Sequence, residues 1–321
     1  MRAHNAISVS GLIVFAVLAT ALAASAQPYG YVSNELGNNV SVVNRATNTI
    51  SAEISVSGAG LSGITVTPNG SYLYAAEQSK NSVAVISTAS NSVVATVPVG
   101  TGPVQVAVTP NGQTVYVANE QSNNVSAINT ATNTVVATIP VGSKPVGLAV
   151  TGDGAYVLVT NFLSANISAI STSSNSVRST WTTLSGPSGI ALGPKGGIAY
   201  VTCQYANSVA VHSISNGSIV ATIPGFAAPN SAAVTPNGAF LYVTNGNSAS
   251  VAAVNASSGQ IVAKVLVGLL PTSVAISADG STAYVTNGYG YSLSEIDMAT
   301  NAVKFTLPHV GVYPFSIALY H

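Results

Sequence analysis

The stretch Thr109-Pro110-Asn111-Gly112, followed closely by Tyr116-Val117-Ala118-Asn119, decides the fold of this chain. Pro, Asn and Gly in this order favour a tight turn, and the apolar run after them is typical of a strand that ends in a polar residue. The strand half occurs seven times, at a first interval of 43 residues and then at intervals of 42. Its first residues are Tyr31, Tyr74, Tyr116, Leu158, Tyr200, Tyr242 and Tyr284. Seven copies at this period predict a stacked or circular repeat architecture.

Each repeat is interpreted as four strands, A to D, of which the recurring motif is strand B. Strand A is clearest at residues 104–108, where large and small residues alternate. This alternation indicates a strand, and its two unlike faces suit a sheet packed between neighbours on both sides. Strands C and D are expected at 125–128 and 135–139, and a Val-Gly-x-x-Pro crossover leads to the next strand A.

The two ends of the repeat region complement each other. Residues 29–34 form a strand B with no strand A before it, and residues 314–320 form a strand A with no strand B after it. We therefore predict an all-β, seven-bladed β-propeller with four antiparallel strands per blade. The C-terminal strand is expected to close the ring by joining the N-terminal blade.

The first 26 residues are interpreted as a secretory signal peptide. Arg2 precedes an apolar run from residue 11, and Ala24-Ser25-Ala26 supplies small residues for cleavage before Gln27. We expect residues 27–321 to be the propeller domain of a secreted, periplasmic or cell-surface protein. No later apolar run is long enough to span a membrane, so no span is expected once the signal is removed.

Composition excludes some classes of partner and cofactor. Only 5 % of residues are charged and the formal net charge is zero. A nucleic-acid partner would need a cluster of Lys and Arg, so none is expected. The single cysteine, Cys203, rules out an intramolecular disulfide and a multi-cysteine metal site. It takes the place of Asn in other repeats, and we expect a buried, inert thiol.

Tyr242-Val243-Thr244-Asn245 and Tyr284-Val285-Thr286-Asn287 make the chain resemble the YVTN-type seven-bladed β-propeller repeat family. Leu158, Cys203 and Glu77 depart from the motif. The resemblance covers nearly all of 27–321 and implies an exported propeller similar to surface-layer proteins and lactonase-like propellers. Because that family is functionally mixed, the resemblance alone does not give an activity.

Candidate site residues gather on one predicted face of the ring, which carries the B–C loops and the D–A crossovers and is called the crossover face. Its candidates for acid–base chemistry are Glu35, Glu77, Glu120 and His309, and the three glutamates are also candidate ligands for Ca2+ or Mg2+. Lys144 and Tyr313 in two crossovers are candidate ligand-binding residues.

The opposite face, the turn face, carries the A–B and C–D turns, and its charged residues are expected to have structural roles. His212 is predicted to pack between blades, Glu295 to lie near a sheet edge or solvent, and Asp297 to cap a turn. The Asn that ends strand B is predicted to cap the B–C turn. The remaining turn-face residues assigned structural roles are Arg45, Asp153, Lys195 and Asp279.

Three hypotheses of function follow. The first is a non-catalytic binding or surface module without a cofactor, whose ligand on the crossover face is a protein, a glycan or a small molecule. The second is a divalent-cation-dependent lyase or lactonase-like enzyme on the crossover face. The third is an accessory protein of a periplasmic dehydrogenase. The sequence carries no G-x-S-x-G elbow, no dinucleotide-binding loop in a βαβ unit and no H-E-x-x-H motif.

Overall fold

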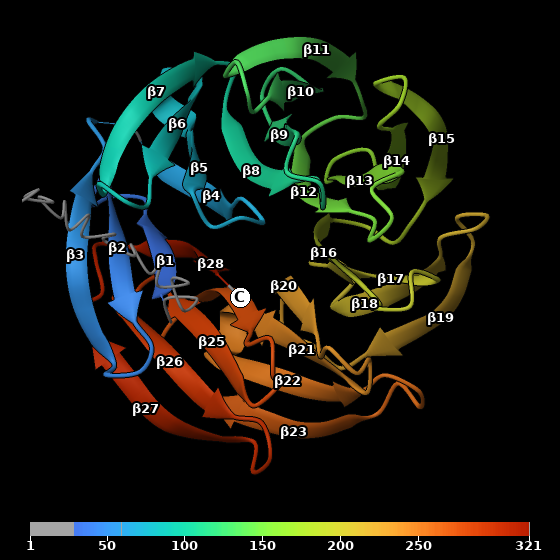
Figure 1. Ribbon diagram of the computed structural model, residues 1–321. Helices are drawn as coiled ribbons and strands as arrows, with labels where there is room; N and C mark the ends of the chain where they lie inside the picture. The colour runs from blue at the N-terminus through green and yellow to red at the C-terminus, as the bar shows by residue number, and fades with distance from the viewer. Residues whose placement is uncertain (1–28, 59, 321) are drawn as a thin grey trace, which may run out of the picture.

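Seven four-stranded antiparallel sheets are arranged as the blades of a ring (Figure 1). The computed structural model describes residues 29–58 and 60–320. The predicted signal peptide and its cleavage site before Gln27 therefore lie outside the described residues. In the described ranges, no helix is long and apolar enough to cross a membrane.

The strands fall into four positions, from the central channel outward, and blades 1 to 7 are numbered from the N-terminus. The innermost strands are β28 (Pro314–Leu319), β4 (Leu61–Val66), β8 (Pro103–Val108), β12 (Pro145–Val150), β16 (Pro187–Leu192), β20 (Pro229–Val234) and β24 (Pro271–Ile276). The second strands are β1 (Tyr29–Asn34), β5 (Tyr72–Glu77), β9 (Thr114–Asn119), β13 (Tyr156–Asn161), β17 (Ile198–Cys203), β21 (Phe240–Asn245) and β25 (Thr282–Asn287).

The two outer positions complete each blade. The third strands are β2 (Asn39–Asn44), β6 (Ser82–Ser87), β10 (Asn124–Asn129), β14 (Asn166–Ser171), β18 (Ser208–Ser213), β22 (Ser250–Asn255) and β26 (Ser292–Asp297). The outermost strands are β3 (Thr49–Ser55), β7 (Ser92–Pro98), β11 (Thr134–Pro140), β15 (Ser176–Thr182), β19 (Ile219–Pro224), β23 (Ile261–Leu266) and β27 (Ala302–Pro308). Two short 3-10 helices, η1 (Gln78–Lys80) and η2 (Gly246–Ser248), lie in B–C loops.

The ring closes as predicted. Strand β28 pairs antiparallel with β1, and Tyr31 faces Ala318 in the register while Ser33 faces Ser316. The backbone N–H of Ser316 also donates to the Ser33 hydroxyl at 3.2 Å. Blade 1 is therefore built from both ends of the described chain, so the ring has no unpaired seam.

The hydrophobic core lies between neighbouring blades. Val40 and Ile54 of blade 1 pack with Leu61, Leu73 and Ile86 of blade 2, and all five are at most 2 % exposed. Replacing a buried aliphatic of this size by Ala typically costs about 2–5 kcal/mol of unfolding free energy. The apolar alternation of the sequence thus packs each blade against its neighbours.

The Asn that ends strand B crosslinks two strands, which corrects the prediction that it caps the B–C turn. The side-chain Nδ2 of Asn119 donates to Asn124 Oδ1 at 2.8 Å and to Ser126 Oγ at 2.9 Å, and Asn161 and Asn287 make corresponding contacts. The side chain is buried and points across to the third strand, so it cannot turn back to its own loop.

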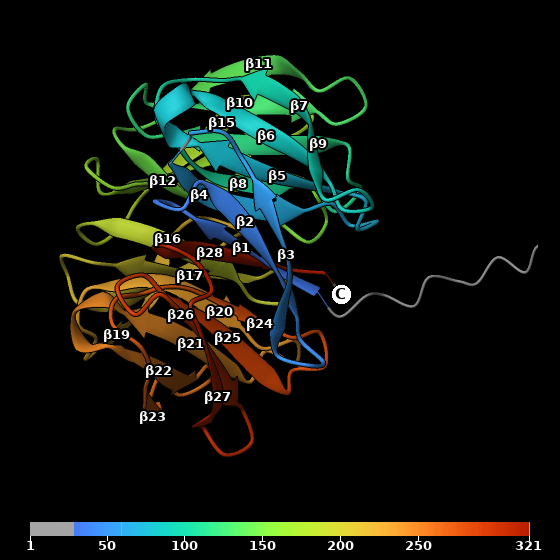
Figure 2. The same cartoon turned by 90° about the vertical axis from the view of Figure 1, so that its left-hand side faces the viewer.

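The two faces of the ring are separated in Figure 2, where the loops of the crossover face lie to the left and β28 ends on the right, at the turn face. The antiparallel order of the strands places all B–C loops and D–A crossovers on one side. Side chains from different repeats can therefore meet around the channel opening on the crossover face.

Candidate functional site

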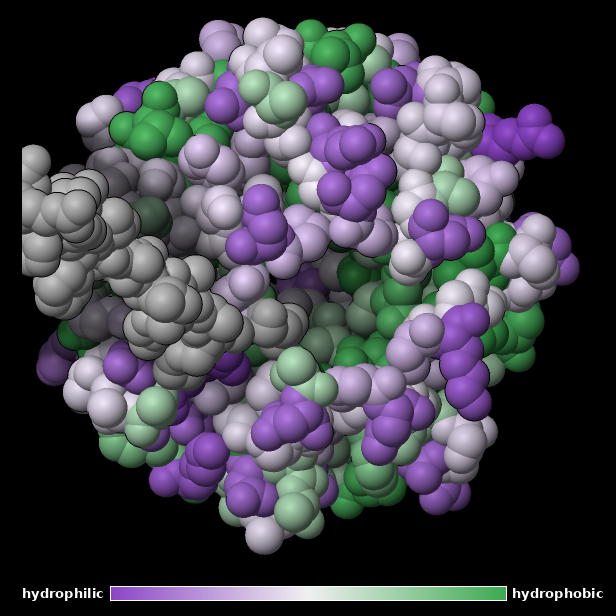
Figure 3. All heavy atoms as spheres, viewed as in Figure 1, coloured by the Kyte–Doolittle hydropathy of each residue, from purple (hydrophilic) through white to green (hydrophobic). Residues whose placement is uncertain are grey.

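A cavity of about 580 Å³ lies on the axis of the ring. The innermost strands form its wall, and loops of the crossover face form its rim. Figure 3 looks along the axis from the turn face and shows a central hollow with hydrophobic residues inside it. Polar side chains along the wall include Gln105, Ser188, Asn230 and Thr272. We call the end of this cavity at the crossover face the channel mouth.

One position of the repeat supplies most of the channel mouth. It is the residue directly after the second strand, four positions after the start of each motif. In blades 6 and 7 this residue is Gly246 or Gly288, without a side chain. In blades 1 to 5 the side chain lines the cavity, and the residues are Glu35, Gln78, Glu120, Phe162 and Gln204.

A second set of side chains reaches the mouth from crossovers with left-handed backbone. Lys144, Leu270 and Tyr313 have φ values of 59°, 51° and 57°, and all three line the cavity. The equivalent positions in other blades include Gly60 and Gly102, which adopt φ of 57° and 66° without a side chain. A non-glycine residue pays roughly 1–2 kcal/mol for this conformation. Three large side chains therefore occupy this crossover position against the preference of the backbone.

An ion pair crosses between two blades at the mouth. Lys144 Nζ lies 2.9 Å from Glu120 Oε1, and the two side chains are 39 % and 19 % exposed. Glu120 Oε2 also accepts a long hydrogen bond of 3.5 Å from Gln78 Nε2. The Lys144 ammonium lies 5.3 Å from the centroid of the Phe162 ring, within range of a cation–π contact. These contacts order a polar and aromatic wall across blades 2 to 4.

Glu35 differs from Glu120, because its half-buried carboxylate forms no hydrogen bond or ion pair within the described chain. Burial raises the pKa of Glu35 above its usual value. Burial and the neighbouring Glu35 raise the pKa of the Tyr313 phenol, which also stacks edge-to-face with Tyr289 at 5.4 Å between ring centroids. A carboxyl with unused hydrogen-bonding capacity thus lines the mouth near the phenol of Tyr313.

Two of the six predicted site residues do not belong to this site. Glu77 is 2 % exposed, accepts a hydrogen bond of 2.6 Å from Ser82 Oγ, and lies 3.8 Å from Lys80 Nζ. Neither Glu77 nor His309 lines the cavity. Across residues 29–58 and 60–320, no group of three or more His, Cys, Asp or Glu side chains could hold a metal ion. The structure thus brings together Glu35, Glu120, Lys144 and Tyr313.

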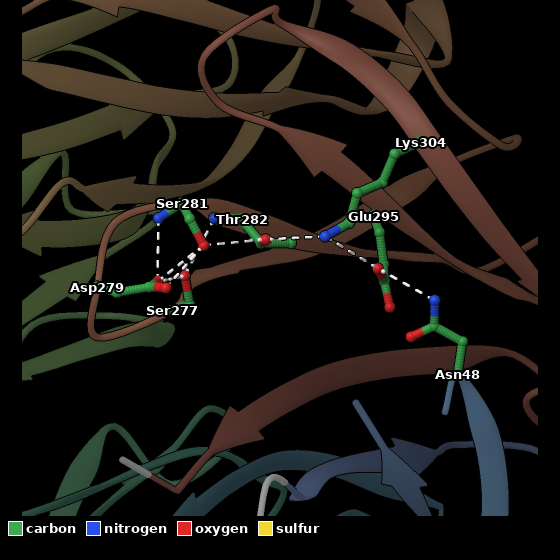
Figure 4. A network of polar contacts seen from close by, with 7 residues as sticks. All are labelled: Asn48, Ser277, Asp279, Ser281, Thr282, Glu295 and Lys304. Carbon is green, nitrogen blue, oxygen red and sulfur yellow. Dashed lines mark hydrogen bonds and ion pairs between the residues drawn. The ribbon is translucent and has the colours of Figure 1, made fainter. Parts of the chain in front are cut away.

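The prediction for Glu295 is wrong. This residue is 3 % exposed, and its carboxylate lies 3.5 Å from Lys304 Nζ and 3.4 Å from Asn48 Nδ2 of blade 1 (Figure 4). Burial raises the pKa of Glu295, while the nearby Lys304 opposes that rise. These two partners compensate for much of the free-energy cost of burying the carboxylate. The pattern of one repeat could not predict Asn48 as a partner, because it comes from another blade.

The predicted burial of Cys203 and His212 and the predicted turn roles of three aspartates are confirmed. Cys203 and His212 are fully buried, and Asp297 Oδ1 accepts from the backbone N–H of Ala299 at 2.9 Å. Asp153 and Asp279 bond within their own turns in the same way. These groups stabilise blades and turns.

The sequence interpretation missed Gln78, Phe162, Gln204 and Leu270 as site residues. An alignment of the seven repeats would have identified these residues. The residue type varies between repeats at the position after the second strand and at the left-handed crossover position, whereas the flanking positions repeat. In a chain with only 5 % charged residues an isolated charge is conspicuous, whereas a neutral amide or an aromatic ring is not.

The fold and its axial cavity define a seven-bladed β-propeller. The model of the family described as "Lactonase, 7-bladed beta-propeller" matches residues 21–138. No curated protein matches the sequence.

Several solved structures share the fold. A chain of Kuenenia stuttgartiensis hydrazine synthase is 22 % identical with a TM-score of 0.77, over 84 % of this chain and 92 % of that chain. A putative 6-phosphogluconolactonase from Bacteroides uniformis is 17 % identical with a TM-score of 0.77, over 92 % and 100 %. The dihydro-heme d1 dehydrogenase NirN, in complex with DHE, is 15 % identical with a TM-score of 0.68, over 88 % and 64 %. At these identities the likeness shows a common fold.

Proposed function

We propose that this protein is an exported binding propeller whose channel mouth takes a small polyhydroxylated ligand, a sugar or a sugar acid, without transforming it. The observation that carries the proposal is the side-chain set that five consecutive blades direct into one cavity. Its volume of about 580 Å³ lies within the usual range of small-molecule sites.

The chemistry of the mouth fits hydroxyl groups. Glu35 and Glu120 accept hydrogen bonds from hydroxyls, while the amides of Gln78 and Gln204 both donate and accept. The ring of Phe162 offers a flat apolar surface to the C–H face of a sugar. The wall side chains Gln105 and Asn230 add further amides deeper in the channel.

A second candidate function, hydrolysis of a sugar lactone, is favoured by Glu35. A half-buried carboxyl with a raised pKa is suited to proton transfer, and Lys144 lies in the same cavity. The partial match to the lactonase family and the structural likeness to a putative 6-phosphogluconolactonase support this candidate.

Isothermal titration calorimetry with glucose, gluconate and gluconolactone tests both candidates. We expect saturable heat with at least one of these probes and an affinity about tenfold lower for Glu120→Gln. The matched control is Glu53→Gln, a carboxylate on an exposed outer strand that should leave binding unchanged. Absence of heat from all three probes would contradict the binding proposal.

The rate of gluconolactone hydrolysis distinguishes the two candidates. A rate above that of buffer that is lost in Glu35→Gln would establish the enzyme, whereas binding at the buffer rate supports the binding module. Repeating the titration with EDTA, and then with added Ca2+ or Mg2+, tests the hypothesis of a divalent cation. A binding constant unchanged by both treatments would exclude a cation requirement.

A further inference from the structure

A recurring hydrogen bond ties neighbouring blades together near the turn face. The tyrosine that begins the motif in one blade donates its hydroxyl to the Asn of the C–D turn in the next blade. Its three instances are Tyr74 to Asn133 at 2.8 Å, Tyr116 to Asn175 at 2.7 Å and Tyr242 to Asn301 at 2.7 Å. The phenol ring and the Asn together cover the boundary between two sheets.

The boundary between blades 4 and 5 lacks both partners. Leu158 stands where the tyrosine would be, and Gly217 stands where the Asn would be. Among the described residues this is the one boundary at which both are replaced. A cavity of about 840 Å³ opens here on the turn face, and the fully buried Leu158 lies beneath its wall. The cavity is separate from the channel mouth, since the two share no lining residue.

Trp181, the sole tryptophan of the chain, lines this cavity. It replaces the aliphatic residue found at the same place in neighbouring blades, Ile139 and Ile223. A Cβ at Gly217 would approach the indole to 2.2 Å, so the glycine makes room for the ring. The indole Nε1 donates to Ser179 Oγ at 2.9 Å, and the ring stacks on His212 at 6.2 Å between centroids. The indole is thus held in place at the cavity wall.

Two cations line the same cavity without an ion pair among the described residues, namely Arg178 and Lys195. Asp153 is also in the lining, but its Oδ1 already accepts from Thr151 Oγ1 at 2.6 Å and from the backbone N–H of Ala155 at 3.0 Å. The lining thus holds two cations and one carboxylate, and neither cation is paired with that carboxylate, so both can meet an anionic ligand.

The turn that carries Lys195 lacks a side-chain hydrogen bond that the equivalent turns in other blades form. In other blades this turn position is Asn or Asp and accepts a hydrogen bond from a preceding hydroxyl, as Asn111 does from Thr109 Oγ1 at 2.7 Å. In blade 5 the two positions are Gly193 and Lys195, so the bond cannot form. The A–B turn of blade 5 therefore lacks this stabilising hydrogen bond and instead places the Lys195 side chain in the cavity lining.

We propose that the cavity between blades 4 and 5 is a second ligand site, which takes a small aromatic carboxylate. The ring of such a ligand would pack against the exposed part of Trp181 and against Tyr156, which also lines the cavity, and its carboxylate would lie near Arg178 and Lys195. Because the cavity combines cations with an apolar wall, a ligand that uses both must carry a negative charge and an aromatic ring. An aromatic amide would lack the charge, and acetate would lack the ring.

Trp181 provides a local reporter, because excitation at the red edge selects tryptophan over the 14 tyrosines. Titrating the full chain with phenylacetate should give a saturable change in Trp181 fluorescence at concentrations up to about 10 mM. Phenylacetamide and acetate should bind at least about tenfold more weakly. Arg178→Gln with Lys195→Gln should reduce phenylacetate affinity about tenfold, while Lys264→Gln, an exposed lysine on another outer strand, should not. No saturable change with the unaltered chain would overturn the proposal.

A repeat-restoring variant gives a second test by calorimetry. Leu158→Tyr, Gly217→Asn and Trp181→Ile together rebuild the boundary seen between blades 3 and 4, where Tyr116, Asn175 and Ile139 occupy these places. Circular dichroism checks that the variant is folded, because His212 remains where that boundary has Ile170, and the folded variant should lose phenylacetate binding. Unchanged phenylacetate heat in the folded triple variant would show that the cavity is not the site.

Discussion

Gly142 in a crossover packs directly against the side chain of Asn161, so that a Cβ at Gly142 would lie 2.7 Å from Asn161 Cγ. Gly100 and Gly268 stand in the same relation to Asn119 and Asn287. The Asn side chain of the motif therefore fits only because the Val-Gly crossover has a glycine, with no Cβ, facing it. In blade 5 the crossover has Leu184, and the strand ends in the smaller Cys203.

Gly142→Ala should destabilise the fold by about 1–3 kcal/mol, because the added methyl forces apart a buried contact that cannot relax freely. Urea denaturation monitored by circular dichroism measures the loss. Gly197→Ala is the matched control, since a Cβ there meets nothing within 4 Å. Equal losses for the two variants would contradict the packing interpretation.

Two variants of Lys144 separate its backbone strain from its contribution to ligand binding. Because its φ is 59°, Lys144→Gly should be more stable than Lys144→Ala by roughly 1 kcal/mol, the reverse of the usual order. Both variants lose the ion pair to Glu120 and should lose ligand affinity to the same extent. Urea denaturation and calorimetry of the two variants together check this, and an alanine variant as stable as the glycine variant would argue against backbone strain.

The fold could be predicted because each of its determinants repeats. The motif spacing gives the number of blades, and the missing strand at one end matches the extra strand at the other, as the pairing of β1 with β28 confirms. Local alternation and turn residues agree with the tertiary structure at every blade, so counting them is sufficient.

The site could be predicted only in part, because a shift of one residue changes the direction of a side chain. Glu35 and Glu120 lie four positions after the start of their motifs and face the mouth. Glu77 lies three positions after Tyr74, in the place of the buried Asn, and points into the blade. Successive side chains of a strand point to opposite faces, so similar acidic residues near a strand end do not share a site.

The tyrosine bond between blades should contribute measurably to stability. Tyr116→Phe removes the donor to Asn175 while keeping the ring, and a loss of about 0.5–1.5 kcal/mol is expected in urea denaturation. Tyr156→Phe is the control, because this hydroxyl forms no hydrogen bond within the described chain. A loss no greater than that of the control would show that the bond to Asn175 does not stabilise the boundary.

His212 should make stability depend on pH. Its Nδ1 lies 2.9 Å from the carbonyl oxygen of Gly217 and therefore carries the proton, and its Nε2 lies 2.9 Å from Thr183 Oγ1 and accepts from it. Burial lowers the pKa of His212 below the ordinary 6.5. Below about pH 6.5 the unfolded chain binds a proton that the folded chain does not. The free energy of unfolding therefore decreases as the pH is lowered.

The expected contribution is complete above the unfolded pKa and declines by up to about 1.4 kcal/mol per pH unit below it, until the folded pKa is reached. Urea denaturation at about pH 7.5 and 5.5 measures this for the unaltered chain and for His212→Ile, which carries the residue found at the same place in blades 3 and 4, Ile128 and Ile170. Carboxylates such as Glu35 and Glu295 titrate in both proteins, so the difference between the two isolates His212. A variant that loses as much stability on acidification as the unaltered chain would show that the buried imidazole is not the group responsible.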